Sequence, residues 1–218
     1  MRWEDVLFAH WPVEPAVVRD RLPPEVALDT FDGRAWLGVV PFVMADIRPR
    51  GVPVGRSFPE LNLRTYVRHG GDRGVYFFSL DAGDRLGTAV ARTAFGLAYR
   101  SAETDVRRRG TSVCFRSRRR GEPSLRFDAT YGPNGEPFDA RERPLTRFLV
   151  ERYRFFAPLR GGLFVGTIDH DPWTLRPGRL ELRQENCFRA NAFAPPAGDP
   201  TVHYCPGIDV TAGLPRPA

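Results

Sequence analysis

The sequence FPELNLRTYVRHGGDRGVYFFSLD, residues 58–81, predicts two β-strands joined by a turn at residues 69–74. Successive side chains of a strand point to opposite faces. In the first strand the polar or amphipathic side chains therefore share one face; they are Glu60, Asn62, Arg64 and Tyr66. This polar row is either a solvated outer face or the lining of an internal cavity.

The second strand, from residue 75 to residue 80, is apolar on both faces, as expected of a strand that is buried on both sides. Phe58, Tyr76 and Phe78 place aromatic side chains next to the polar row. Aromatic walls with a few polar groups are typical of ligand pockets. We therefore favour the cavity over the solvated face.

Length and composition suit one domain with a sizeable core: 218 residues, 42% of them hydrophobic. No run approaches the roughly 18 to 20 apolar residues of a membrane span, and the N-terminal residues do not read as a signal peptide. Cys114, Cys187 and Cys205 are odd in number and widely spaced, which favours reduced thiols. We expect a soluble, cytoplasmic protein that does not interact with a membrane.

The chain contains no lysine, so all 32 basic residues are arginine. Amine nucleophiles and lysine Schiff bases are thereby excluded. The stretch 100–126 carries nine arginines against three acids, which accounts for the whole net charge of +6. Such a stretch can hold phosphates, but solvated arginine-rich hairpins are the simpler interpretation, and only Phe115 adds an aromatic side chain. Nucleic acid is not the expected partner.

The remaining pattern predicts a single α+β domain over residues 1–218. Proline positions and apolar periodicity predict helices at 15–22, 83–95 and 144–156, with Arg92 near the end of the second. A strand is expected at 35–44, with a bulge at Gly38 or Pro41. Residues 48–55, rich in proline and glycine, are expected to form an ordinary exposed loop, with a mobile lid as the alternative. Further strands are expected at 112–118, 124–131, 162–169 and 178–186, with a short element at 201–210.

Seven segments then carry a family resemblance. In chain order they are FAHWP (8–12), LDTFDGRAWLGVVPF (28–42), ELNLRTYV (60–67), GVYFFSLDA (74–82), AR-x-x-F-x-L-x-Y (91–99), FLVERY (148–153) and H-x-P-W (170–173). Together they resemble the YqjF-like family of uncharacterised bacterial proteins, within the acetoacetate-decarboxylase-like superfamily. The resemblance implies a curved, mostly antiparallel β-sheet that closes to a cone or barrel around an internal cavity, with a few peripheral helices.

The decarboxylase of that superfamily uses a lysine Schiff base with a glutamate and an arginine nearby. Glu60 resembles that glutamate in position, and the segment from Arg92 through Tyr99 and Arg100 resembles the region that carries the lysine. Since this chain has no lysine, decarboxylation through an amine is not carried over. What the resemblance leaves is a pocket, in particular one for an anion.

Glu60 and Arg64 form the first candidate pair. A spacing of four residues puts them on one strand face about 13 to 14 Å apart, so they would approach a ligand from two sides. Arg92 offers a second guanidinium for a carboxylate. The alternative is a set of structural salt bridges. Asn62, Tyr66, Tyr76, Phe78, Arg92 and Tyr99 are the expected substrate-binding residues, with Tyr66 or Tyr76 as a proton donor.

His10, His170 and His203 each neighbour an aromatic residue, and none has the spacing of a metal site. Packed structural histidines are therefore expected, and His10 is the candidate acid or base if one of them is catalytic. Cys187 and Cys205 are interpreted as buried inert thiols. The chain has no nucleophile elbow, phosphate loop or dinucleotide motif, so no cofactor is predicted.

Two hypotheses follow. The first is a lyase-type or isomerase-type enzyme that acts on a small organic acid or carbonyl compound by acid–base or electrostatic catalysis with Glu60, Arg64 and His10. The second is a non-catalytic protein that binds a small metabolite. A buried Glu60 with a raised pKa would favour the enzyme. A monomer and a homodimer both agree with the sequence.

Overall fold

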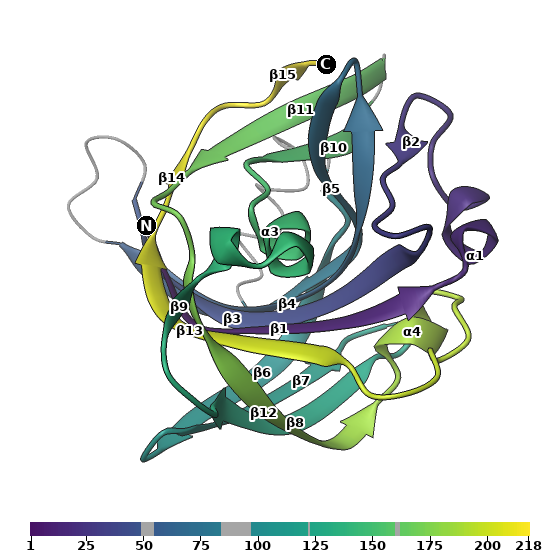
Figure 1. Cartoon of the computed structure of the whole chain (residues 1–218). Coiled ribbons are helices and arrows are strands. Elements are labelled where there is room, and N and C mark those ends of the chain that lie inside the picture. Colours follow the sequence, from purple (N-terminus) through teal and green to yellow (C-terminus); the bar gives the residue numbers. More distant parts are fainter. Residues whose placement is uncertain (49–54, 84–96, 122, 160–161) are drawn as a thin grey trace.

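The computed structural model describes residues 1–48, 55–83, 97–121, 123–159 and 162–218. Its centre is a closed barrel (Figure 1), because β5 pairs with β4 on one edge and with β6 on the other. Around the barrel the strands are β5 (Asp72–Ala82), β6 (Tyr99–Arg109), β7 (Ser112–Arg119), β8 (Arg126–Pro133), β12 (Thr174–Glu185), β13 (Thr201–Asp209), β1 (Arg2–Val13), β3 (Ala35–Ile47) and β4 (Arg56–His69). Neighbouring strands are antiparallel except β5 and β6, which are parallel.

A second, smaller sheet leaves the barrel at β5. The first half of β5 pairs in parallel with β10 (Arg154–Leu159), and β10 pairs with β11 (Gly162–Asp169). Two short strands, β14 (Thr211–Ala212) and β15 (Arg216–Pro217), extend the edge of β11. The other elements are α1 (Pro15–Arg19), β2 (Ala27–Leu28), β9 (Phe138–Asp139), a 3₁₀ turn (Ala140–Glu142), α3 (Pro144–Val150) and α4 (Cys187–Ala190). Figure 1 shows α3 between the smaller sheet and strands β1, β3 and β4.

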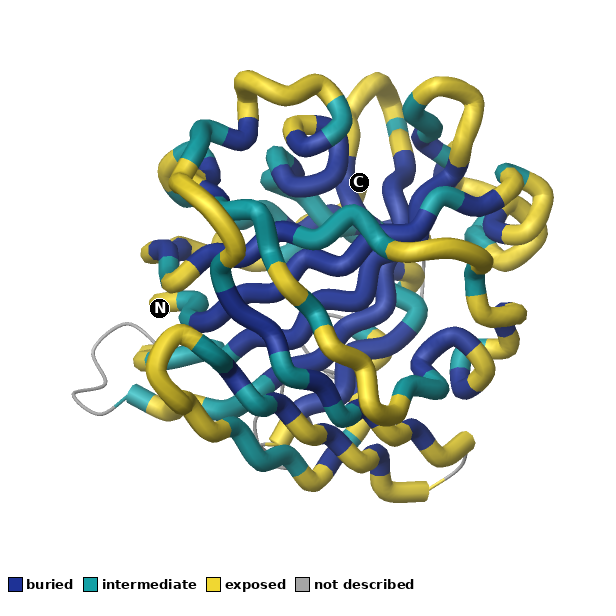
Figure 2. Tube along the Cα trace, turned by 60° about the horizontal axis from the view of Figure 1, so that its bottom comes forward, coloured by how far each residue is buried: buried dark blue, intermediate teal, exposed yellow. Residues whose placement is uncertain are grey.

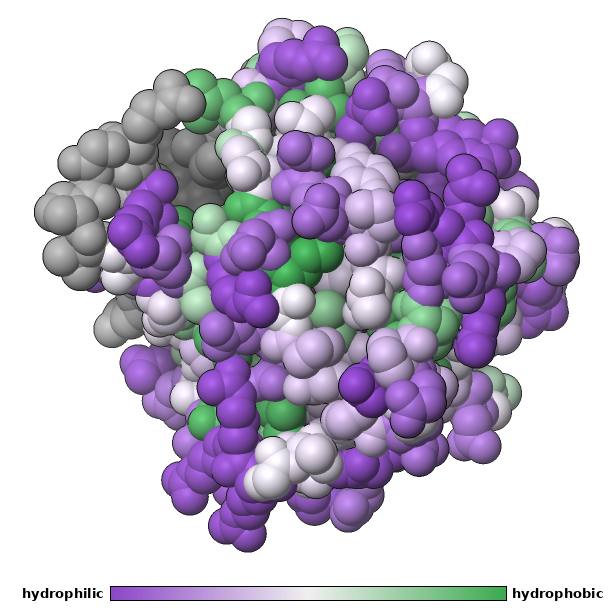
Figure 3. All heavy atoms as spheres, turned by 60° about the vertical axis from the view of Figure 1, so that its left-hand side comes forward, coloured by the Kyte–Doolittle hydropathy of each residue, from purple (hydrophilic) through white to green (hydrophobic). Residues whose placement is uncertain are grey.

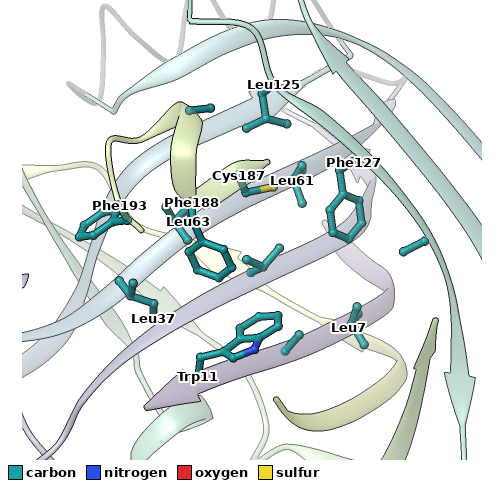
Figure 4. Packing of buried hydrophobic residues seen from close by; sticks show 14 of the residues in the cluster. Leu7, Trp11, Leu37, Leu61, Leu63, Leu125, Phe127, Cys187, Phe188 and Phe193 are labelled. Carbon is teal, nitrogen blue, oxygen red and sulfur yellow. The ribbon is translucent and has the colours of Figure 1, made fainter. Parts of the chain in front are cut away.

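The wall formed by β1, β3 and β4 is buried on both faces (Figure 2). Its inner face packs against β7, β8 and α4 inside the barrel, where leucine and aromatic side chains interdigitate (Figure 4). Its outer face packs against α3 and residues of β5 and β13 in a second apolar cluster. The chain thus builds two cores on one shared sheet.

The β4–β5 hairpin predicted from the sequence is confirmed. His69 pairs with Asp72, and the two residues between them, Gly70 and Gly71, have φ values of +55° and +90°. A two-residue turn that matches the twist of the strands needs positive φ at these positions, which glycine adopts without strain.

Two local predictions are wrong. The helix expected at 144–156 ends at Val150, and residues 154–159 form strand β10 instead. Pairing with β5 places Phe155 and Phe156 on opposite faces, each in a different apolar cluster, so tertiary packing outweighs the helical pattern. The bulge of β3 lies between Met44 and Ile47, not at Gly38 or Pro41. The helix expected at 83–95 lies almost entirely outside the described residues.

The molecular surface is mainly polar. The face in Figure 3 is mostly hydrophilic, with apolar side chains showing in small separate patches. Among the described residues, the large apolar side chains with substantial exposure are Val17, Leu182 and Leu214. None of the helices in the described ranges is both long and apolar enough to cross a membrane.

Candidate functional site

The polar row of β4 lies on the outer face of the shared wall. Glu60, Asn62, Arg64 and Tyr66 are all buried, with 2%, 4%, 8% and 0% of their surface exposed. The prediction that they share one face is confirmed, because Leu61 and Leu63 between them pack into the barrel core. The row is not a solvated face. It divides into two hydrogen-bonded centres.

The first centre is built around Glu60. The hydroxyl of Tyr99, at the start of β6, donates to Oε2 of Glu60 at 2.7 Å, and Nδ2 of Asn62 lies 3.4 Å from Oε1. Burial raises the pKa of Glu60 from 4.5 to about 7, while the hydrogen bonds from Tyr99 and Asn62 oppose this rise and the charge of Asp81 adds to it. Burial and the neighbouring Glu60 raise the pKa of Tyr99 well above 10.

The second centre joins His10, Tyr66 and Arg64. Nε2 of His10 and the hydroxyl of Tyr66 are 2.7 Å apart, and Nη2 of Arg64 donates to the carbonyl oxygen of Leu149 in α3 at 3.2 Å. The pKa of His10 is held well below 6.5, first by burial, then by the charges of Arg64 and His203. His10 is therefore neutral at pH 7.

Glycine at position 38 makes this second centre possible. In the sheet register, Gly38 of β3 lies between His10 of β1 and Arg64 of β4. A Cβ atom at Gly38 would stand 2.7 Å from Cδ2 and 2.9 Å from Nε2 of His10, and 3.4 Å from Cγ of Arg64. The imidazole thus occupies the space that a side chain at position 38 would fill.

Three other buried carboxylates are already paired with arginine. Asp29 binds Arg152 at 2.9 Å and Arg68 at 2.6 Å, which ties the end of α3 to β4. Asp81 forms a bidentate pair with Arg119 at 2.5 and 2.7 Å. Asp5 accepts from Arg108 and from the hydroxyl of Tyr204. Sequence reasoning missed these pairs, because their members are 38 to 199 residues apart and no local pattern joins them.

The structure does not bring every predicted residue to the row. Tyr76 packs with the apolar cluster of β10 and β11. Phe78 contacts Phe193 edge to face at the barrel core. The reason is an irregularity of β5: Leu63 pairs with Ser79 but Arg64 pairs with Phe77, which leaves Phe78 without a partner on β4. The placement of Tyr76 and Phe78 beside the row is therefore corrected, and Phe77 takes it. Arg92 lies outside the described residues.

The other histidines and the cysteines sit in packed surroundings. Nε2 of His203 lies 3.3 Å from Oγ1 of Thr146, and burial with the charge of Arg143 lowers the pKa of His203 to about 4. His170 stacks on Tyr153. The three cysteines are free, and burial raises the pKa of Cys187 and Cys205. Within the described ranges, no three His, Cys, Asp or Glu side chains are grouped as a metal site would require.

The arginine-rich stretch is largely engaged in ion pairs. Arg108 binds Glu4 and Asp5, Arg116 binds Asp128, and Arg120 binds Glu103. The arginines lie on β6, on β7 and directly after β7, and their acidic partners lie on β1, β6 and β8. These pairs reduce the local positive charge.

An open cleft of about 590 Å³ lies at another part of the surface, beside the start of β1 and the end of β13. Its lining includes five carboxylates (Glu4, Asp46, Asp169, Asp171 and Asp209) and no residue of the polar row. The carboxyl group with the raised pKa and its tyrosine partner are in the buried layer, so we place the candidate site there and not in this cleft.

The chain belongs to the DUF2071 family, described as "Uncharacterized conserved protein (COG2071)", whose model matches residues 1–209. It is 40% identical over 211 residues to the uncharacterized protein YqjF of Bacillus subtilis (strain 168). The aligned region covers 95% of this chain and 87% of that protein. The family resemblance inferred from the sequence is thus confirmed.

Solved structures of acetoacetate decarboxylase-like enzymes share the fold. Acetoacetate decarboxylase from Legionella pneumophila aligns with a TM-score of 0.64 and 17% identity over 98% of this chain and 85% of its own. The enduracididine biosynthesis enzyme MppR aligns with a TM-score of 0.67 and 12% identity, over 99% of this chain and 87% of its own. That structure is complexed with the condensation product of pyruvate and imidazole 4-carboxaldehyde. The expected barrel is confirmed. The location of the polar row is corrected: the described residues inside the barrel pack as an apolar core, and the row lies on the outer face of the wall.

Proposed function

We propose that this protein is an enzyme that transfers a proton on a small organic acid or carbonyl compound, with Glu60 and Tyr99 as the catalytic pair. The reaction is of the lyase or isomerase type. It proceeds without a Schiff base, because the chain has no lysine. One observation carries the proposal: a fully buried carboxyl group with a pKa of about 7, hydrogen-bonded to a tyrosine hydroxyl.

A group with this pKa suits proton transfer at neutral pH, because it is both ionised and protonated in comparable amounts. Ionised Glu60 takes a proton from the carbon next to a carbonyl, and the electron pair of that C–H bond moves to the carbonyl oxygen as an enolate. Tyr99 stays protonated, since its pKa lies well above 10. Its single hydroxyl proton, donated to Glu60 in the free protein, is donated to this oxygen when the substrate is bound. Return of the proton from Glu60 completes the exchange or the isomerisation.

The relatives support this choice of substrate class. MppR, which has the same fold, is known in a complex with pyruvate, so a small oxo acid is a ligand of that protein. Tyr99 lies in the segment that resembles the lysine-bearing region of the decarboxylase. We infer that its hydroxyl takes part in the chemistry where the lysine of the decarboxylase does.

The experiment is solvent exchange: the protein is incubated in D₂O with pyruvate or acetoacetate, and deuterium uptake at the carbon next to the carbonyl, above the rate without protein, is followed by NMR. We expect exchange with the wild type, at least a hundredfold loss in Glu60→Gln and Tyr99→Phe, and no loss in the control Glu103→Gln, whose side chain is exposed on β6.

The outcomes separate the two hypotheses. Exchange that survives in Glu60→Gln contradicts the assigned role. A ligand that binds and shows no exchange in the wild type favours the second candidate, a non-catalytic binding protein, for which the buried charge of Arg64 is the supporting observation.

A further inference from the structure

Arg64 carries a buried charge that the described part of the chain does not compensate. A guanidinium is always protonated. Its hydrogen bond to Leu149 goes to a neutral carbonyl oxygen, and its Nε has no partner. Its other neighbours are also uncharged: the rings of Phe8 and Tyr66, at 5.3 and 5.9 Å, the hydroxyl of Tyr66, and the neutral His10.

The nearby carboxylates are committed elsewhere. Asp29 is bound to Arg152 and Arg68, and Asp81 is bound to Arg119. Glu60 is hydrogen-bonded to Tyr99 and is only partly ionised at neutral pH. A buried charge without a partner is destabilising by several kcal/mol. A carboxylate brought by a ligand would provide the missing partner and form charge-assisted hydrogen bonds with Nε and a terminal nitrogen.

Asn62 specifies a second group of the ligand. The side-chain nitrogen of Asn62 donates to Oε1 of Glu60 at 3.4 Å, as the ionised form of Glu60 requires. The amide oxygen, Oδ1, then points elsewhere; it is buried and has no donor. An unsatisfied buried acceptor costs about 1–3 kcal/mol. Oδ1 of Asn62 therefore needs a hydrogen-bond donor, an O–H or N–H group, from the ligand. The oxo oxygen of an oxo acid cannot donate a hydrogen bond.

The register puts these three side chains in sequence along one buried face. Asn62 lies between Val40 and Leu80, and Arg64 lies between Gly38 and Phe77, so a carbon skeleton that passes along the row meets apolar neighbours. An amino group at Asn62 would bring a second cation next to Arg64, which is unfavourable in a buried layer. A hydroxyl group has no such cost.

Building on the proposed function, we propose that the substrate is a small carboxylic acid that carries both a hydroxyl group and a carbonyl group. Its carboxylate binds Arg64 and its hydroxyl donates to Oδ1 of Asn62. The carbonyl, beside the carbon that loses the proton, is at the other end of the molecule. The reacting end of the molecule then lies toward Glu60 and Tyr99. Asn62 is the residue that distinguishes a hydroxy acid from an oxo acid of the same length.

Matched ligand pairs test this inference: lactate against pyruvate, and 3-hydroxybutyrate against acetoacetate, each by isothermal titration calorimetry. In the wild type we expect at least one hydroxy acid to bind about 10-fold or more tightly than its oxo partner, since 1.4 kcal/mol corresponds to a factor of ten. Asn62→Leu, nearly equal in size, should reduce this ratio to about one. Arg64→Met should weaken both members of the pair. Far-ultraviolet circular dichroism checks that the variants fold.

Oxo acids that bind the wild type as tightly as their hydroxy partners overturn the inference, and so does a hydroxy-acid preference that persists in Asn62→Leu. The comparison of hydroxy-acid and oxo-acid affinities in the wild type tests the inference even if Asn62→Leu does not fold. Deuterium exchange on oxo acids without a hydroxyl preference overturns this inference alone. If neither class binds and no exchange occurs, the proposed function fails as well.

Discussion

Replacing Glu60 by glutamine should stabilise the protein at alkaline pH. Folding raises the pKa of the Glu60 carboxyl from 4.5 to about 7, mainly by burial. An acid with a raised pKa in the folded state gives up stability when it ionises, so the cost is absent below pH 4.5, grows as the pH rises, and is complete above pH 7. At 1.36 kcal/mol per pKa unit, the cost is about 3 kcal/mol.

Glutamine removes the ionisation and keeps an acceptor oxygen for the hydroxyl of Tyr99. The free energy of unfolding, measured by urea titration from pH 4 to 9, should therefore be similar in Glu60→Gln and the wild type near pH 4.5. Above pH 7 the variant should be more stable by about 3 kcal/mol. Other titrating groups affect both proteins equally and cancel in the difference.

The opposite pattern would refute the reasoning. If Glu60→Gln is less stable than the wild type at pH 8, the carboxylate is a structural ion-pair partner. The proposed catalytic role would then lose its physical basis.

Three more perturbations test the surrounding layer. The pKa of His203 is lowered to about 4 from 6.5. Urea unfolding should therefore show that the wild type loses about 3 kcal/mol relative to His203→Gln between pH 6.5 and pH 4; no change in this difference contradicts the burial of a neutral His203. Arg119→Met should cost about 3–5 kcal/mol because Asp81 stays buried and unpaired, and Asp81→Asn in the same chain should recover much of it; no recovery contradicts the pairing. Gly38→Ala should push the ring of His10 away from Tyr66 and lower stability by about 1–3 kcal/mol; an unchanged melting temperature and unchanged His10 NMR shifts would contradict the close packing.

The strand pattern was readable from the sequence wherever one period dominated. Glu60 and Arg64 fall on one face because Leu61 and Leu63 alternate with them, and the Gly70–Gly71 turn leaves one way to connect the strands. The alternation does not show which face of the sheet points into the barrel and which points outward. The apolar residues between the polar ones enter the barrel, and the polar row enters a second buried layer against α3.

The partners in the site depend on contacts that the local sequence does not encode. Tyr99 reaches Glu60 across 39 residues, and Tyr66 reaches His10 across 56. Phe78 was misplaced because a single unpaired residue in β5 changes which side chains face β4. The strand at residues 154–159 was misread for a related reason: its apolar residues suit a helix locally but pair with β5 in the fold.

The most direct test of the central claim is the titration of the Glu60 side-chain carboxyl by carbon-13 NMR, with the resonance assigned by its loss in Glu60→Gln. We expect a midpoint near pH 7 in the wild type, and a higher midpoint in Tyr99→Phe because the hydrogen bond from Tyr99 lowers the pKa of Glu60. A midpoint below pH 5 in the wild type would contradict the account.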